Sequence, residues 1–249
     1  MTNHDRSSRF DTVRRAAERG YVSAQLMFGQ MLLDGSDQPA DPIRALCWFA
    51  IAADAGHMPA MNMLGRCHEK GWGTEADPGR AAVCYRRAAD EGDDWGRYNL
   101  ANMLLRGRGV VRDRREAWRL FHEAATSGHA KSMNLVGRFL EEGWDRERDP
   151  AVARAWYRRS AEAGDYRGRH NLATALAEDG HHDEALDWWR QALPDATPDI
   201  LQAMVQALAR IDHAGVAPLL LAVRQRLAPM PAPVRPGFWR ARFRRLSRG

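Results

Sequence analysis

The chain has 249 residues, 45% of them hydrophobic, and a formal net charge of +5. This length allows one sizeable domain or an elongated array of smaller units. The longest apolar run covers residues 45–53, less than half of the roughly twenty residues that a membrane-spanning helix needs. No apolar segment follows the opening MTNHDRSSRF, so a secretory signal is not expected and we expect a soluble, cytoplasmic protein.

Positive charge is concentrated at the end of the chain. Residues 228–249 contain six arginines and no acidic residue, which leaves residues 1–227 with a formal charge of −1. The basic character therefore belongs to this tail, and it gives no reason to expect that the body binds nucleic acid. The three cysteines, Cys47, Cys67 and Cys84, lack the close paired spacing of a zinc site and are expected to be free thiols in the core.

The first predicted helix covers about residues 7–19, and a unit that recurs every 36 residues follows it. Glycine recurs in two columns, aspartate in a third and an aromatic residue in a fourth. The columns are Gly20, Gly56, Gly92, Gly128 and Gly164; Gly35, Gly71, Gly107 and Gly143; Asp41, Asp77, Asp113 and Asp149; and Phe49, Tyr85, Phe121 and Tyr157. Such a fixed period predicts stacked copies of one supersecondary structure.

Each unit is predicted to contain two helices. Asp41 followed by Pro42 predicts the start of the second helix, because aspartate caps exposed N–H groups and proline is tolerated in the first turn. Apolar residues then recur at intervals of three and four, and Gly56 is expected to end the helix in the left-handed conformation. In the following helix Met61, Leu64 and Gly65 are expected to face inward. One pair of helices cannot bury its apolar face alone, so the pairs should stack.

These features resemble the Sel-one-like repeat family, a relative of the tetratricopeptide α-solenoids. The resemblance rests on MNMLGRCHEKGWGTEADPGRAAVCYRRAADEG (61–92) and YNLANMLLRGRGVVRDRREAWRLFHEAATSG (98–128). It implies an all-α fold, a right-handed α-solenoid of stacked antiparallel helix pairs. We place an N-terminal helix within residues 1–20, repeats at 21–56, 57–92, 93–128 and 129–164, and a degenerate fifth repeat at 165–197.

The chain departs from the repeat pattern after the fourth unit. The fifth unit lacks the Gly-x-Gly and Asp-Pro loop and is closer to the shorter tetratricopeptide form. Two further helices are predicted at 198–211 and 215–227, and we expect this segment, 198–227, to cap the open end of the stack. Of the adjacent Trp188 and Trp189, one is expected in the core; the other could anchor a partner or pack against the cap helices.

No catalytic motif is present in the sequence. It contains no nucleophile elbow, phosphate-binding loop or zinc-protease motif, so we expect no enzyme activity, cofactor, metal site or small-molecule substrate. His181 and His182 stand next to two acidic residues, but adjacent side chains at a helix start point in different directions, which favours a helix cap over a metal site. His57 and His129 each follow a column glycine and are expected to have a turn or packing role.

The resemblance implies where a partner would bind. In tetratricopeptide-like solenoids the first helix of each pair lines the concave face. Positions that flank the Leu-Gly of this helix, which is Leu64-Gly65 in the second unit, are therefore expected to be exposed there. The predicted partner-binding residues are Asn62, Arg66, Tyr98, Asn102, Arg106, Asn134, Arg138 and His170. Asparagine amides can bind a peptide backbone and arginines can pair with carboxylates, so we expect a groove for a peptide or protein with acidic residues. The alternative is a solvated helix face without a ligand.

The Pro/Arg-rich tail, residues 228–249, is a second candidate. Four prolines between 229 and 236 oppose a regular helix and indicate a linker. Arginines and aromatic residues then alternate, a composition that suits an anionic membrane, a nucleic acid or an acidic protein. The residues are Arg235, Phe238, Trp239, Arg240, Arg242, Phe243, Arg244 and Arg245. The alternatives are a solvated terminus and aromatic residues that fold back onto the last helices.

The leading hypothesis is a non-catalytic scaffold or adaptor that binds a peptide or protein partner, because repetition creates an extended surface with unit-specific polar residues. The resemblance implies the same role. One alternative is a regulatory or immunity-type protein that sequesters a single partner. Another is a module that docks on an anionic surface through its tail.

Overall fold

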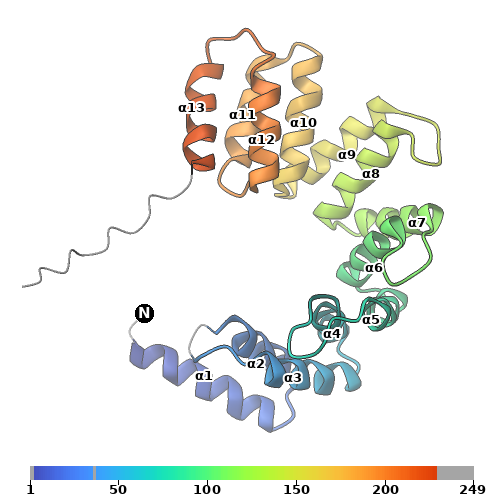
Figure 1. Cartoon of the computed structure of the whole chain (residues 1–249), viewed down its shortest axis with the longest axis vertical. Helices are drawn as coiled ribbons and strands as arrows, with labels where there is room; N and C mark the ends of the chain where they lie inside the picture. Colours follow the sequence, from blue (N-terminus) through green and yellow to red (C-terminus); the bar gives the residue numbers. More distant parts are fainter. Residues whose placement is uncertain (1–2, 36–37, 229–249) are drawn as a thin grey trace, which may run out of the picture.

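The computed structural model describes residues 3–35 and 38–228, and within these ranges the chain forms thirteen α-helices and no strand. The helices are α1 Asn3–Glu18, α2 Val22–Asp34, α3 Pro42–Asp54, α4 Met58–Lys70, α5 Pro78–Asp90, α6 Asp94–Arg106, α7 Arg114–Thr126, α8 Ala130–Glu142, α9 Pro150–Glu162, α10 Tyr166–Glu178, α11 His182–Ala192, α12 Pro198–Leu208 and α13 Val216–Leu227. They stack side by side into an open arc (Figure 1). The predicted all-α solenoid is confirmed.

Hydrogen bonds repeated in each unit set the ends of the second helices. Asp77 accepts a hydrogen bond from the backbone N–H of Arg80 at 2.9 Å, and the other column aspartates cap their helices in the same way. After α3, the N–H of Gly56 bonds to the carbonyl of Ala53, and the next N–H bonds to the carbonyl of Ala52. Gly56 has a φ of +84°, so this is the left-handed turn that ends a helix with glycine.

The core lies between the two helices of each pair and between successive pairs. The aromatic column, which is Phe49, Tyr85, Phe121 and Tyr157, is fully buried. Gly65 of α4 faces this column, and a Cβ atom there would lie 2.6 Å from Cε1 of Tyr85. The glycine is therefore needed because the aromatic ring of the second helix packs directly on the backbone of the first.

Alternate units differ in how this aromatic residue is held. Tyr85 donates a hydrogen bond from its phenol to Oε2 of Glu69 at 2.9 Å. Two units later, Tyr157 donates the same bond to Oε2 of Glu141 at 2.7 Å. The first and third units carry phenylalanine and leucine in these two columns, as Phe49 with Leu33 and Phe121 with Leu105. These hydrogen bonds therefore repeat every two units along the arc.

The loops of the second and third units touch the preceding unit. A Cβ atom at Gly73, whose φ is +74°, would lie 2.2 Å from the carbonyl oxygen of Pro42 at the start of α3. Gly109 approaches Pro78 in the same way. In the fourth unit Asp145 occupies this column with a φ of +55°, and its carboxylate lies 3.8 Å from the guanidinium of Arg114. An ion pair therefore stands where the earlier units have a close backbone approach.

Several local expectations can be compared with the structure. The helix predicted for 198–211 ends three residues early, because the chain turns after Leu208 and the N–H of Arg210 bonds to the carbonyl of Ala207. Trp189 is fully buried and Trp188 is half-buried against the core. Cys67 is buried, but Cys47 lies exposed on α3, so the core position predicted for it is wrong.

None of the helices in the described ranges combines the length and the apolar character needed to span a bilayer. The tail residues Arg235, Phe238, Trp239, Arg240, Arg242, Phe243, Arg244 and Arg245 lie outside the described residues.

Candidate functional site

A groove runs across the first helices α2, α4, α6 and α8. It has a volume of about 910 Å³ and is lined by Ser23, Leu26, Met27, Gln30, His57, Pro59, Asn62, Met63, Arg66, Trp95, Tyr98, Asn99 and Lys131. Trp95 and Met27 supply apolar surface, since each is 45% exposed. We call this space the inner groove. A second hollow of about 200 Å³ adjoins it, because both are lined by Arg66, Tyr98 and Asn99.

The second hollow extends the site toward the ends of α4 and α6. Its lining includes Asn102, Arg106 and Arg108, together with Glu69 and Lys70. Arg108 and Lys70 both pair with Glu69, at 3.2 and 3.0 Å. Arg106 has no such carboxylate within 4.0 Å among the described residues, so its charge faces the hollow without a protein partner.

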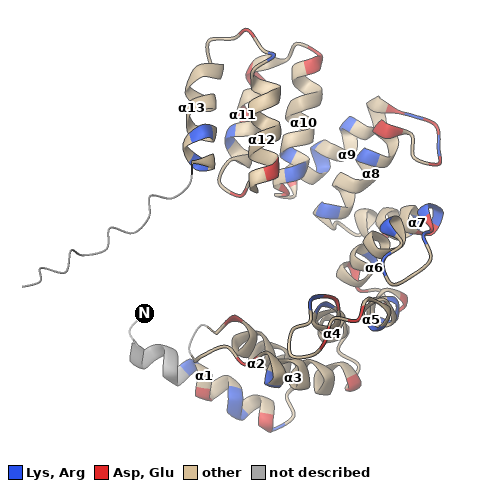
Figure 2. Ribbon diagram, in the orientation of Figure 1, with Lys and Arg blue, Asp and Glu red and all other residues tan. Residues whose placement is uncertain are grey.

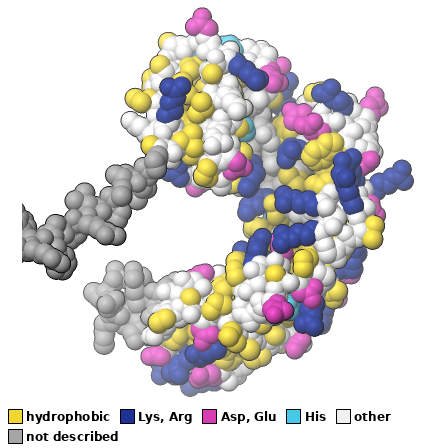
Figure 3. Space-filling view, viewed as in Figure 1, with side chains coloured by type: hydrophobic (Ala, Val, Ile, Leu, Met, Phe, Trp, Pro, Cys, Tyr) yellow, Lys and Arg dark blue, Asp and Glu magenta, His cyan; other side chains and the backbone are white. Residues whose placement is uncertain are grey.

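Five cations of the first helices share this property. They have no carboxylate within salt-bridge distance in the described part of the chain, and they are Arg66, Arg106, Lys131, Arg138 and Arg167, from α4, α6, α8 and α10. We call them the inner cations. Figure 3 shows Lys and Arg side chains gathered on the hollow side of the arc, and Figure 2 shows basic residues where α8 and α10 approach it.

Aromatic rings hold most of the inner cations in place. The guanidinium of Arg66 lies 5.1 Å from the ring centre of Trp72, and that of Arg138 lies 5.2 Å from Trp144. The ammonium of Lys131 lies 4.7 Å from the ring centre of Trp95. Such cation–π contacts fix the direction of a charge without neutralising it, so the charges remain available to an anionic group.

The inner cations are close enough to affect one another. Partial burial, together with the positive charges of Arg167 and Arg66, lowers the pKa of Lys131 below its ordinary value, and the nearby carboxyl of Asp165 only partly opposes this. Arg167 and Arg106 also act on the phenol of Tyr98, whose pKa is raised chiefly by burial. A carboxylate bound here would relieve the repulsion among these charges.

Asn62, Tyr98, Asn134 and His170 stand in one column of the repeat and were predicted to be exposed. This prediction is wrong at three of the four positions. Asn62, Asn134 and His170 are buried, with 7%, 2% and 8% of their surface exposed. The reason is that these three side chains are engaged by neighbouring helices. Asn99 of α6 donates a hydrogen bond to Oδ1 of Asn62 at 2.7 Å, and Asn171 of α10 donates one to Asn134 at the same distance.

His170, in the degenerate fifth unit, has a different buried partner. The indole Nε1 of Trp189 donates a hydrogen bond to its Nδ1 at 3.1 Å. Burial lowers the pKa of His170 from 6.5 to about 4, so the ring is neutral at pH 7 and can accept this bond. His170 therefore connects α10 to α11 and does not reach the inner groove.

The structure brings the other predicted residues together only in part. Arg66, Tyr98, Asn102 and Arg106 line the inner groove or the adjoining hollow, with Asn62 at its border. Arg138 is exposed on α8 but lines neither space. Trp95, Lys131 and Arg167 were not among the predicted residues. They share one column with Ser23 and Pro59 in the first turn of each first helix. The residue type in that column changes from unit to unit, and this variation could have identified these positions from the sequence.

The histidines that follow column glycines start the first helices. Nδ1 of His57 accepts a hydrogen bond from the N–H of Ala60 at 3.3 Å, which is the predicted turn role. His129 lies against Trp95 and Tyr98, with ring centres 4.7 and 5.1 Å away. Burial lowers the pKa of His129 to about 4, so it adds no charge to the groove at neutral pH. No group of three or more metal-binding side chains is arranged around one point in the described ranges.

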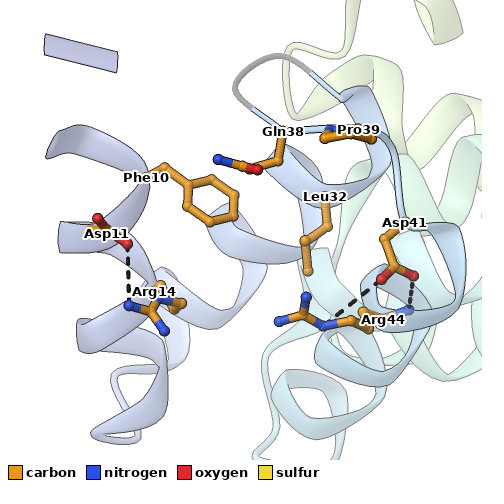
Figure 4. A pocket seen from close by; sticks show the side chains of 8 residues that line it. All are labelled: Phe10, Asp11, Arg14, Leu32, Gln38, Pro39, Asp41 and Arg44. Carbon is orange, nitrogen blue, oxygen red and sulfur yellow. Dashed lines mark hydrogen bonds and ion pairs between the residues drawn. The ribbon is translucent and has the colours of Figure 1, made fainter. Parts of the chain in front are cut away.

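A further pocket, of about 360 Å³, lies at the N-terminal end of the arc between α1 and the start of α3 (Figure 4). Its two arginines already have partners. Arg14 pairs with Asp11 at 3.2 Å, and Arg44 approaches Asp41 at 3.9 Å. This pocket therefore offers an anionic ligand no free cation, in contrast to the inner groove.

Comparisons with known proteins agree with this architecture. The family model for the Sel1 repeat matches residues 22–57, 59–93, 96–129 and 130–165. A Sel1 repeat protein from Oxalobacter formigenes is 25% identical with a TM-score of 0.71, over 82% of this chain and 84% of that one. The protective antigen c5321 of uropathogenic Escherichia coli is 26% identical with a TM-score of 0.68, over 87% of this chain.

This chain spans only 48% of the length of c5321. The immunity protein PA5088 from Pseudomonas aeruginosa shares the fold at 16% identity, with a TM-score of 0.60 over 84% of this chain and 80% of that one. The repeat matches cover more than half of the sequence and coincide with the stacked helix pairs, so the chain belongs to the Sel1 repeat family.

Proposed function

We propose that this protein is a non-catalytic adaptor that binds an acidic segment of a protein partner along the inner face of its arc. Sel1 repeats are typical of protein-interaction scaffolds, which supports the general role. The observation that carries the proposal is the set of five inner cations without carboxylate partners in the described residues.

The chemistry of the inner groove favours such a partner. An ion pair formed at a half-buried site such as Arg66 or Lys131 is less screened than one on an open surface. Hydrogen bonds to charged groups contribute about 1.5–3 kcal/mol each, so a few of them give useful affinity. Trp95 and Met27 add apolar contact area beside the charges, as expected for a site that also holds a partner's side chain.

The test is site-specific photo-crosslinking in the source organism with the full-length chain. A photoreactive residue in place of Asn102 faces the adjoining hollow, and one in place of Val83, which is exposed on α5, serves as the control. We expect the first to crosslink a discrete partner through a peptide rich in Asp and Glu, and the second not to. A crosslinked peptide without acidic residues would contradict the proposal.

Charge reversal gives a matched control. The R66E/R106E/K131E variant changes three inner cations, and R87E/R115E/R159E makes the same change in net charge on the second helices α5, α7 and α9. Arg87, Arg115 and Arg159 also have no carboxylate partner within salt-bridge distance among the described residues, so both variants remove unpaired charges. Only the first should lose the crosslink. Equal loss in both would mean that binding follows overall charge alone.

Activity measurements on the purified partner also distinguish an adaptor from the alternative role, a protein that sequesters one partner. An adaptor should bind this partner and leave its activity intact. A sequestering protein should form a stoichiometric complex in which that activity is lost.

A further inference from the structure

The inner cations on the third turn of the first helices occur in every second unit. This column holds Gln30, Arg66, Asn102, Arg138 and Thr174. It therefore alternates between a neutral hydrogen-bonding side chain and an arginine. Arg66 on α4 and Arg138 on α8 are two units apart, with Asn102 of α6 between them.

Both arginines sit in the same structural setting. One turn before each arginine, an asparagine accepts a hydrogen bond from the next first helix, as Asn62 does from Asn99. Three residues after each arginine, a glutamate accepts a hydrogen bond from a buried tyrosine of the second helix. Each arginine then lies over a loop tryptophan, at 5.1 and 5.2 Å. These contacts position two equivalent charges, whereas the units on either side carry none in this column.

The spacing of the helices relates these charges to a ligand. First helices of successive units touch along this part of the arc: α4 contacts α6, the ammonium of Lys131 on α8 lies over the ring of Trp95 on α6, and α8 contacts α10. Packed helices have axes roughly 8–10 Å apart, so α4 and α8 are separated by somewhat less than about 20 Å along the inner face. An extended peptide advances about 3.3 Å per residue, so roughly six residues cover this separation.

We propose that the inner face selects an extended acidic segment whose carboxylates lie about six residues apart, one group at Arg66 and the other at Arg138. The peptide between them crosses α6 at Asn102. This inference rests on the proposed function and adds to it the spacing of the acidic residues. A partner with one acidic cluster, or with closely spaced clusters, engages a single arginine.

The experiment uses the full-length chain and fluorescein-labelled synthetic peptides in a Gly/Ser background. Each peptide carries two Asp-Glu pairs whose centres are about three, six or nine residues apart, and a fourth carries one pair. Binding is followed by fluorescence anisotropy at low ionic strength. The peptide with the spacing of about six should bind roughly fivefold more tightly than the peptide with the spacing of about three, which cannot reach both arginines. It should bind about twofold more tightly than the peptide with the spacing of about nine, whose longer flexible spacer lowers the effective concentration of the second pair.

R138A should remove this preference, and all three two-pair peptides should then bind with similar affinity. R159A is the matched control, since Arg159 is exposed and lies 4.9 Å from the ring of Trp156, so the same charge and the same kind of stacking are lost. It should keep the preference. The tail arginines attract the three two-pair peptides alike because these carry the same charge, so the differences between spacings report on the inner face. Circular dichroism and thermal melting of each variant verify that the fold is retained.

Equal affinities for the three spacings, or a preference that survives in R138A, would overturn the inference. If R66E/R106E/K131E still lost the binding of all peptides, the proposed function would stand without the spacing rule. If neither the triple variant nor R138A changed any affinity, both ideas would fail together.

Discussion

Tyr85 on α5 donates a hydrogen bond to the carboxylate of Glu69 on α4, and the phenylalanine units of the arc have a leucine where this glutamate stands. The two columns change together: tyrosine accompanies glutamate in the second and fourth units, and phenylalanine accompanies leucine in the first and third. Covariation inside one chain thus identifies a pair of positions in contact, and it suggests that the pair can be exchanged as a unit.

The first prediction concerns this exchange. Y85F removes the donor to Glu69 and should lower the free energy of unfolding by about 1 kcal/mol, while E69L alone leaves the buried Tyr85 hydroxyl unpaired and should cost about 1–3 kcal/mol. The double variant reproduces the pair found in units one and three, so it should be more stable than E69L. Urea unfolding of the four chains measures the coupling. Strictly additive effects would mean that the two residues do not interact.

The second prediction separates backbone strain from steric clash at two glycines. Gly73 has a positive φ, and its Cβ position lies 2.2 Å from the carbonyl oxygen of Pro42. Gly56 also has a positive φ, but beyond its own chain neighbours no atom lies within 4 Å of its Cβ position. G56A should therefore cost about 1 kcal/mol of strain, and G73A should cost clearly more because the loop must move away from α3. Thermal melting measures both, and equal losses would show that the loop contact adds nothing.

The third prediction is a pH dependence that comes from His170. Burial lowers its pKa from 6.5 to about 4 in the folded chain, so between these values the unfolded chain binds more protons. The stability that neutral His170 contributes is therefore complete above about pH 6.5 and is lost as the pH falls toward 4. The loss amounts to roughly 3 kcal/mol at most.

H170N tests this assignment, because the asparagine Oδ1 can accept the hydrogen bond from Trp189 but does not titrate. Urea unfolding at pH 7 and near pH 4 should show a smaller loss of stability in H170N than in the parent chain. His129, whose pKa is also lowered to about 4, contributes the same background to both chains. An unchanged pH dependence would show that His170 is not responsible.

The sequence was sufficient for the fold because the signals for helix ends are local. An aspartate cap, a proline in the first turn and a glycine after the last turn act within a few residues, so the periodic columns predict the helices directly. The inner face was harder to predict. Whether Asn62 faces the hollow or the next unit depends on the rotation between neighbouring units, which no single unit determines.

Part of that information was nevertheless present in the sequence. Asn99 and Asn171 each follow by 37 residues the asparagine that they contact. For the other pairs of positions in these two columns separated by this interval, at least one of the two residues is apolar. Comparing columns in pairs would have indicated the buried contacts. Arg106, which is exposed, and Arg66, which is half-buried, were among the predicted residues without such a comparison.

The last prediction concerns the Pro/Arg-rich tail. Residues 228–249 hold six arginines and three aromatic side chains, and each basic residue near an anionic bilayer contributes about 1 kcal/mol of attraction. A chain that ends at residue 228 lacks all six of these arginines. It should therefore bind vesicles with 30% phosphatidylserine roughly tenfold more weakly, or more weakly still, than the full chain. R66E/R106E/K131E, which keeps the tail, should bind them nearly as well as the parent chain does. Vesicle sedimentation over a range of salt concentrations measures this, and undiminished binding of the truncated chain would assign membrane attraction to the helical arc instead.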